Sequence, residues 1–153
     1  MRLGDARGGD FTEPRGRKGR PRILLADDHS HVLASLSRLA DEAGEVVGTV
    51  QDGRAAVAES LRLRPDVMVL DLVMPGIGGI EAARLLRREM PNIRVIICTM
   101  QTNLFVIDEA FTAGAAGFIR KQSAYRDLAA AIRAVFAGQR FVSPELRDRC
   151  LRS

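Results

Sequence analysis

Polar side chains of distinct chemistry stand at the ends of the short apolar runs in this sequence. The first run ends in Asp27 and Asp28, the third in Asp71, the fourth in Thr99 and the fifth in Lys121. In an open parallel sheet, ligands bind beyond the carboxyl ends of the strands. If the runs are parallel strands, three carboxylates, one hydroxyl and one ammonium meet at one edge of the sheet.

This set of side chains favours metal-dependent phosphoryl chemistry. Three carboxylates in one crevice repel one another, and a bound hard cation relieves the repulsion. Mg²⁺ suits a site with one or two carboxylates, several waters and a phosphate oxygen, whereas Ca²⁺ takes more oxygen ligands. An aspartate can also attack phosphorus and form an acyl phosphate. We therefore expect Mg²⁺ as the cofactor and an aspartate as the nucleophile.

Lys121 is one of only two lysines in a chain with many arginines, and the other is Lys18. A lysine at a strand end in such a chain indicates a need for a compact point charge, which arginine does not supply. The alternative interpretation is a solvated strand end without a function.

Apolar runs alternate with helical patterns along most of the chain. The runs predict buried strands at 23–26, 46–50, 67–70, 94–98 and 117–120. Helical spacing predicts helices at 30–43, 53–64, 79–89, 103–113 and 125–137. Ser30 and Gly138 are the expected N-cap and C-cap of the first and last helix. The pattern predicts an α/β fold, a doubly wound five-stranded parallel sheet with helices on both faces.

The net charge of +4 belongs to the beginning of the chain. Residues 1–22 carry seven basic and three acidic side chains, and the remainder is neutral. We interpret 1–21 as a basic, disordered tail, and a neutral folded part argues against DNA binding by this chain alone. No stretch reaches the roughly 20 apolar residues of a membrane span, and the N-terminus lacks the apolar core of a signal peptide. We expect no membrane contact and a cytoplasmic location.

These motifs resemble the receiver domains of two-component response regulators. The resemblance rests on the acidic pair, on the run from Asp71 to Pro75, on Thr99, and on the stretch from Gly114 to Lys121. It extends over residues 22–141, the expected receiver domain, and leaves 142–153 as a C-terminal linker or short helix. It implies a flavodoxin-like strand order, 2-1-3-4-5.

Two further segments are similar to one subgroup of that family. They are Asp27-Asp28-His29 and the segment from Gly138 to Pro144. The subgroup usually precedes a LuxR-type helix-turn-helix domain. His29 itself is interpreted as a loop or helix-start residue rather than a ligand.

The resemblance implies a role for each residue of the site. Asp71 matches the phosphoacceptor, and Asp28, Asp71 and the backbone carbonyl of Val73 would hold Mg²⁺, with Asp27 acting through a bound water. Thr99 and Lys121 would each bind a phosphoryl oxygen.

The resemblance also implies a conformational switch. Phe118 matches an aromatic side chain whose rotamer follows that of Thr99 when the phosphoryl group arrives. Backbone N–H groups of Val73 and Met100 would complete the cradle around the phosphoryl group.

The function implied is a signalling switch that accepts a phosphoryl group from a histidine kinase or phosphotransfer protein. Such a domain is not an enzyme with an external substrate, because it catalyses only its own phosphorylation and dephosphorylation. A homodimer formed on phosphorylation is a further partner that the resemblance allows.

Two alternatives stay open at the level of sequence. One is an aspartate-nucleophile phosphatase of the haloacid-dehalogenase type. Enzymes of that class carry an Asp-x-Asp motif after their first strand. Here Asp71 follows the third apolar run, and position 73 is Val. The other is a receiver-like interaction module that does not need phosphate.

Overall fold

The computed structural model describes residues 19–152. The predicted basic tail lies outside the described residues, apart from its last three positions. Within the described range no helix is both long enough and apolar enough to cross a membrane.

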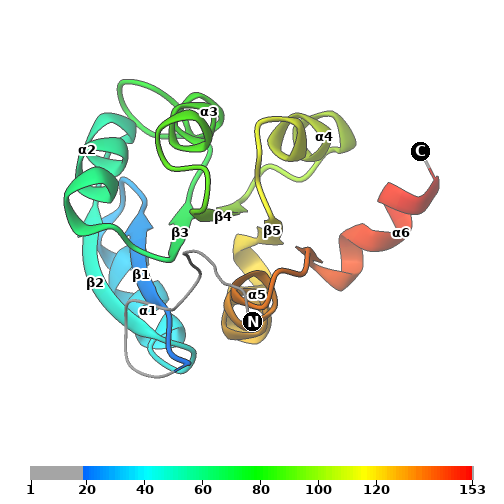
Figure 1. The fold of residues 1–153 in the computed structure, drawn as a ribbon. Helices are drawn as coiled ribbons and strands as arrows, with labels where there is room; N and C mark the ends of the chain where they lie inside the picture. The colour runs from blue at the N-terminus through cyan, green and yellow to red at the C-terminus, as the bar shows by residue number, and fades with distance from the viewer. Residues whose placement is uncertain (1–18, 153) are drawn as a thin grey trace, which may run out of the picture.

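One parallel sheet organises the described part of the chain (Figure 1). It has six strands there: β1 (Arg22–Ala26), β2 (Glu45–Val50), β3 (Val67–Leu70), β4 (Arg94–Thr99), β5 (Gly117–Arg120) and β6 (Phe141–Val142). The strand order is β2-β1-β3-β4-β5-β6, and every pair is parallel. The predicted α/β class and the order 2-1-3-4-5 are confirmed.

The number of strands corrects the sequence analysis. A short sixth strand, β6, pairs with β5 through Gly117 and Phe118. The domain limit expected at residue 141 therefore falls inside a strand. Two residues are too few to show the alternation or the apolar run by which a strand is recognised in a sequence.

Helices cover both faces of the sheet (Figure 1). The described range contains α1 (Ser30–Ala40), α2 (Gly53–Leu63), α3 (Gly79–Glu89), α4 (Leu104–Thr112), α5 (Ala124–Phe136), α6 (Pro144–Arg152) and the 3-10 helix η1 (Lys121–Ser123). One apolar cluster joins the sheet to α2, α3 and α4, and a second joins it to α1 and α5.

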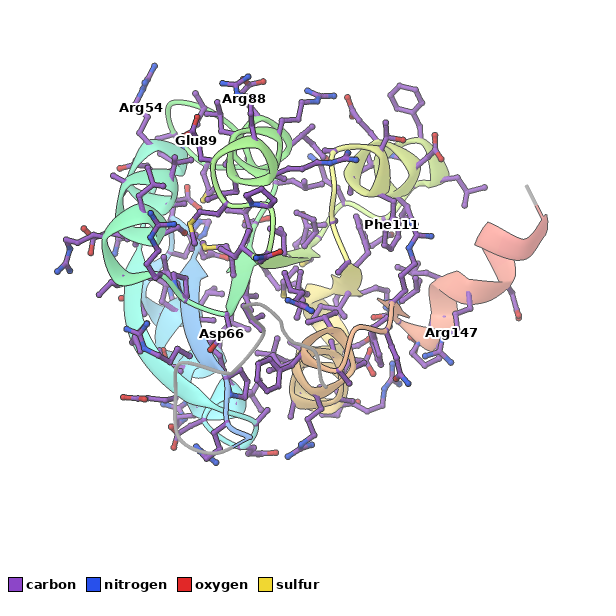
Figure 2. All side chains as sticks on the ribbon, in the orientation of Figure 1. Arg54, Asp66, Arg88, Glu89, Phe111 and Arg147 are labelled. Atoms are coloured by element: carbon purple, nitrogen blue, oxygen red, sulfur yellow. The ribbon has the colours of Figure 1, made fainter. Side chains whose placement is uncertain are left out.

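Alternation along the strands divides their side chains between the two clusters. In β4, Val95 and Ile97 belong to the first cluster, while Ile96 and Cys98 belong to the second. Successive side chains of a strand point to opposite faces, so a continuous apolar run is what a strand covered on both faces requires. Charged side chains such as Arg54 point outward from the helices (Figure 2).

Local side-chain chemistry fixes several helix ends. Asp52 and Asn103 accept hydrogen bonds from backbone N–H groups of α2 and α4, at 2.8 and 3.0 Å. Gly138 follows α5 with φ of +86°, and the N–H of Gln139 donates to the carbonyl of Ala134. This is the glycine-terminated helix end that the sequence predicted, one residue beyond the C-cap Ala137.

The predicted start and end of the first helix need correction. His29 is the N-cap and makes no side-chain cap hydrogen bond, and Ser30 is the first helical residue. The helix ends at Ala40, three residues before the predicted end. Ala43 is buried even so, which explains why it fitted the apolar pattern of the helix.

Candidate functional site

Three of the predicted site residues meet at the carboxyl edge of the sheet. Asp27 follows β1, Asp71 follows β3, and Lys121 follows β5. The ammonium Nζ of Lys121 lies 2.6 Å from Oδ2 of Asp27 and 2.9 Å from Oδ2 of Asp71. Residues separated by 50 and 94 positions in the sequence are therefore in direct contact.

The backbone holds the two aspartates in place. The N–H of Asp27 donates to the carbonyl of Val50 and that of Asp71 to the carbonyl of Ala26, both at 3.1 Å, so each aspartate continues the hydrogen bonding of its strand. At the start of α3, a Cβ on Gly79 would collide with the carbonyl oxygen of Asp71. Glycine at this position lets the helix begin directly against the aspartate.

Burial and charge act in opposite directions on this group. Asp27 and Asp71 are buried. Burial of Asp27 acts to raise its pKa, but hydrogen bonds from Lys121 and from the backbone of His29, with the charge of Lys121, outweigh it and lower the pKa. Burial of Lys121 acts to lower its pKa, but its hydrogen bonds to both aspartates raise it. The contact therefore favours the charged forms of the Asp27 carboxylate and the Lys121 ammonium.

A third carboxylate, that of Asp28, lies beside this group with unmet hydrogen-bonding capacity. Among the described residues, its Oδ1 is buried and accepts no hydrogen bond. The ring Nδ1 of His29 lies 3.0 Å from that oxygen and 3.2 Å from Oδ1 of Asp27, and the backbone N–H of His29 donates to Asp27 at 3.0 Å.

Oxygen and nitrogen atoms of Asp27, Asp28 and His29 lie within 4.8 Å of one another, a spacing compatible with a metal ion. An orphaned buried carboxylate oxygen next to the carboxylate of Asp27 is a donor set that fits a hard divalent cation. The contact of His29 with both aspartates was not predicted. Its only signal in the sequence is its position directly after the acidic pair.

The remaining predicted residues surround this group. Thr99 is buried at the end of β4, where its Oγ1 accepts a hydrogen bond from the N–H of Gln101 at 3.3 Å. Val73 and Met100 lie in the loops after β3 and β4, each with more than half of its surface exposed. Phe118 is fully buried in the apolar cluster shared with α3 and α4.

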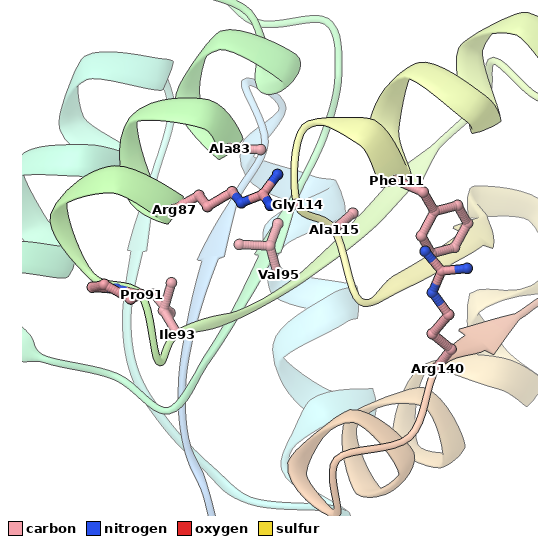
Figure 3. Close-up of a pocket in the computed structure, with 9 residues that line it drawn as sticks. All are labelled: Ala83, Arg87, Pro91, Ile93, Val95, Phe111, Gly114, Ala115 and Arg140. Carbon is pink, nitrogen blue, oxygen red and sulfur yellow. The ribbon is translucent and has the colours of Figure 1, made fainter.

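The opposite edge of the sheet has a different character. A hollow opens there between α3 and α4, beside the start of β4 (Figure 3). Its lining includes Arg87, Val95, Phe111 and Arg140 but no carboxylate, and the Arg140 guanidinium lies 4.3 Å from the centre of the Phe111 ring. The carboxylates of Asp27 and Asp71 thus lie at the edge of the sheet opposite this hollow.

A doubly wound sheet with buried aspartates and a lysine at its carboxyl edge defines the class of receiver domains. The family model of the response regulator receiver domain matches residues 23–133. This chain therefore belongs to the response regulator receiver family.

Relatives agree with this assignment. The chain is 41% identical over 130 residues to the response regulator GacA of Pseudomonas viridiflava, which covers 84% of this chain and 61% of that protein. It is 35% identical over 129 residues to the response regulator UvrY of Escherichia coli K12, covering 83% and 59% of the two proteins. The chain thus spans about 60% of the length of these curated relatives.

Solved structures agree as well. A two-component response regulator of the LuxR family from Aurantimonas sp. SI85-9A1 superposes with a TM-score of 0.83 at 36% identity, covering 87% of this chain and 96% of that one. The isolated receiver domain of RcsB from Salmonella enterica serovar Typhimurium, in the presence of the phosphomimetic BeF3⁻, gives 0.78 at 27% identity, covering 84% and 97%. These relatives support the LuxR-type subgroup.

Proposed function

We propose that Asp71 is the phosphoacceptor of this receiver domain and that a histidine kinase or phosphotransfer protein is the donor. The observation that carries the proposal is the contact of 2.9 Å between the buried Asp71 carboxylate and the ammonium of Lys121, which also binds the carboxylate of Asp27. Both carboxylate oxygens of Asp27 accept hydrogen bonds, one from Lys121 and one from His29. Asp71 accepts a hydrogen bond from Lys121 at one oxygen.

The transfer follows from these contacts. A carboxylate oxygen of Asp71 attacks the phosphorus of a phosphohistidine, the P–N bond breaks, and the imidazole leaves as the acyl phosphate forms. Before the transfer, the carboxylates of Asp27 and Asp71 hold the ammonium of Lys121. After the transfer, Lys121 pairs with a phosphoryl oxygen, because the Asp71 oxygen bonded to phosphorus has lost its negative charge. The hydroxyl of Thr99 donates a hydrogen bond to another phosphoryl oxygen.

Mg²⁺ is the cofactor that the residues fit. Asp28, Asp71 and the backbone carbonyl of Val73 would hold it, and Asp27 would act through a water. When bound, Mg²⁺ neutralises charge on the phosphoryl oxygens.

The chain acts on no external substrate in this proposal. A phosphatase of the haloacid-dehalogenase type needs an acid two residues after the nucleophile, and position 73 is occupied by an exposed valine. Turnover of p-nitrophenyl phosphate with Mg²⁺ would contradict this part of the proposal.

Phosphorylation is tested with acetyl phosphate and Mg²⁺ on a phosphate-affinity gel. We expect one shifted band for the native protein and none for Asp71→Asn. Asp41→Asn is the matched control, because Asp41 is exposed and lies at the end of α1. A shift of equal stoichiometry in Asp71→Asn would overturn the assignment of the phosphoacceptor.

We also propose that the chain works in the cytoplasm, forms a homodimer as one response to phosphorylation, and binds no specific DNA by itself. Residues 23–153 are neutral, so any DNA binding should depend on the basic residues 1–20 and weaken steeply with salt. Sequence-selective, salt-resistant binding in a gel-shift assay would contradict the last point.

A further inference from the structure

Ser143 is a fully buried polar residue between β6 and α6. Its hydroxyl donates to Oδ2 of Asp127 at 2.8 Å and accepts from the backbone N–H of Arg120 at 3.1 Å. Its own N–H donates to the carbonyl of Phe118 at 3.0 Å. Three hydrogen bonds therefore tie the C-terminal segment to β5 and α5.

Charged groups add a second layer around Ser143. Arg126 donates to both oxygens of Asp127, at 2.8 and 3.0 Å, and lies 2.7 Å from Oε2 of Glu145 in the first turn of α6. The guanidinium of Arg120 lies 3.7 Å from the same oxygen of Glu145. We call Ser143, Asp127, Arg120, Arg126 and Glu145 the C-terminal latch.

The first turn of α6 is also anchored by apolar packing. Leu146 is buried and belongs to the apolar cluster that contains Phe118. Beyond this turn, α6 projects away from the sheet (Figure 1). The orientation of the projecting helix therefore depends on the contacts of its first turn.

The latch is attached to the strand that ends in the phosphorylation site. Arg120, whose N–H holds Ser143, directly precedes Lys121, whose ammonium holds Asp71. When Asp71 carries a phosphoryl group, Lys121 follows a phosphoryl oxygen, and the end of β5 moves with it. Hydrogen bonds weaken steeply once their distance and angle depart from the optimum, and Ser143 is fully buried.

We propose that phosphorylation of Asp71 opens the C-terminal latch and releases β6 and α6 from β5. The latch is thereby the route by which the site controls the orientation of the helix that leaves the domain. This inference rests on the proposed function, because it requires that Asp71 accepts the phosphoryl group. Ser143 is a positioning residue in this account and does not touch the phosphoryl group.

Thermodynamic reciprocity gives the proposal a second consequence. If phosphorylation weakens the latch, then breaking the latch favours the phosphorylated conformation by the same factor. Ser143→Ala removes the hydroxyl and both of its hydrogen bonds. A residue that only stabilised the fold would leave the phosphorylation equilibrium unchanged.

The test is amide hydrogen exchange of residues 141–148, followed by mass spectrometry, with and without acetyl phosphate and Mg²⁺. In the native protein we expect phosphorylation to accelerate exchange there about tenfold. In Ser143→Ala, exchange should be fast without phosphate and should change little on its addition. The steady-state fraction of phosphorylated protein at limiting acetyl phosphate should rise about threefold.

Two further variants keep the test decisive. Ser35→Ala makes the same substitution at an exposed position of α1 and should match the native protein in both measurements. Asp127→Asn keeps the shape of the side chain and removes its charge, so it should repeat the Ser143→Ala result in milder form, even if Ser143→Ala does not fold.

The possible failures are distinguishable. A shifted band on the phosphate-affinity gel with unchanged exchange at 141–148 overturns the latch and leaves the proposed function intact. No shifted band overturns the proposed function and the latch with it. Faster exchange without any rise in the phosphorylated fraction would show that Ser143 only stabilises the fold.

Discussion

Two groups of charged side chains meet the end of β5, one at Lys121 and one at Arg120, and they are built in opposite ways. At the carboxyl edge of the sheet, Asp27 and Asp71 share the ammonium of Lys121, and the carboxylate of Asp28 lies beside Asp27. At the C-terminal latch, both oxygens of Asp127 accept hydrogen bonds from Arg126, and one of them also accepts from the hydroxyl of Ser143. Only the site contains a buried carboxylate oxygen without a hydrogen bond among the described residues.

The difference separates charges arranged to bind a ligand from charges arranged to hold one conformation. A balanced pair with all its hydrogen bonds stabilises the arrangement in which it is found. An unbalanced group costs free energy of folding and retains the capacity to bind a cation or a phosphoryl group. The comparison predicts opposite responses to the same kind of mutation at the two places.

Removal of Mg²⁺ should have the largest effect. With three carboxylates and one ammonium, the site lacks the positive charge that an incoming phosphoryl group needs. Chelation with EDTA should slow phosphorylation by acetyl phosphate on the order of a hundredfold, while far-UV circular dichroism stays unchanged. A phosphorylation rate independent of Mg²⁺ would mean that the positive charge of Lys121 alone is enough to neutralise the incoming phosphoryl group.

Alanine substitutions should then divide the two groups. Asp127→Ala should lower the free energy of unfolding by about 2 kcal/mol, because it leaves Ser143 and Arg126 without their buried partner. Asp28→Ala should raise it by about 0.5 kcal/mol in the absence of Mg²⁺, because it removes a carboxylate that repels the neighbouring carboxylate of Asp27. Urea denaturation measures both, and equal losses in the two variants would contradict the comparison.

The sequence predicted the site better than the latch, for physical reasons. Asp27, Asp71 and Lys121 each follow a buried strand, and strand periodicity together with the parallel topology suffices to bring them together. Ser143 gave no such signal, because β6 is two residues long and the partner Asp127 belongs to a helix 16 residues away. The orientation of His29 depends on side-chain packing, which periodicity does not encode.

The latch should also be sensitive to acid. Burial acts to raise the pKa of Asp127, but hydrogen bonds from Arg126 and Ser143 outweigh it, so the pKa lies below its usual value of 3.8. The resulting stabilisation is fully present above that value and is lost as the pH falls through the lowered pKa. Asp127→Asn should therefore lose less stability than the native protein between about pH 5 and pH 2. If the free energy of unfolding, measured by urea denaturation, falls equally with pH in both proteins, Asp127 does not contribute to the pH dependence of stability.

The smallest effect should come from Val73. Hydrolysis of the acyl phosphate needs a water in line with the phosphorus, and valine offers that water no hydrogen bond. Val73→Asn should speed autodephosphorylation by between about threefold and tenfold. Loss of phosphoprotein after removal of the donor measures the rate, with Met100→Leu as a control at the other exposed loop. Equal rates would indicate that another group, such as Gln101, positions the water.

The central claim is that phosphate goes onto Asp71 and not onto its neighbours, and chemical trapping tests it most directly. Borohydride reduces the acyl phosphate of an aspartate to homoserine, which peptide mass spectrometry locates. After treatment with acetyl phosphate and Mg²⁺, the account predicts homoserine at position 71 alone. Homoserine at position 27 or 28, or at no position in protein that carries phosphate, would contradict it.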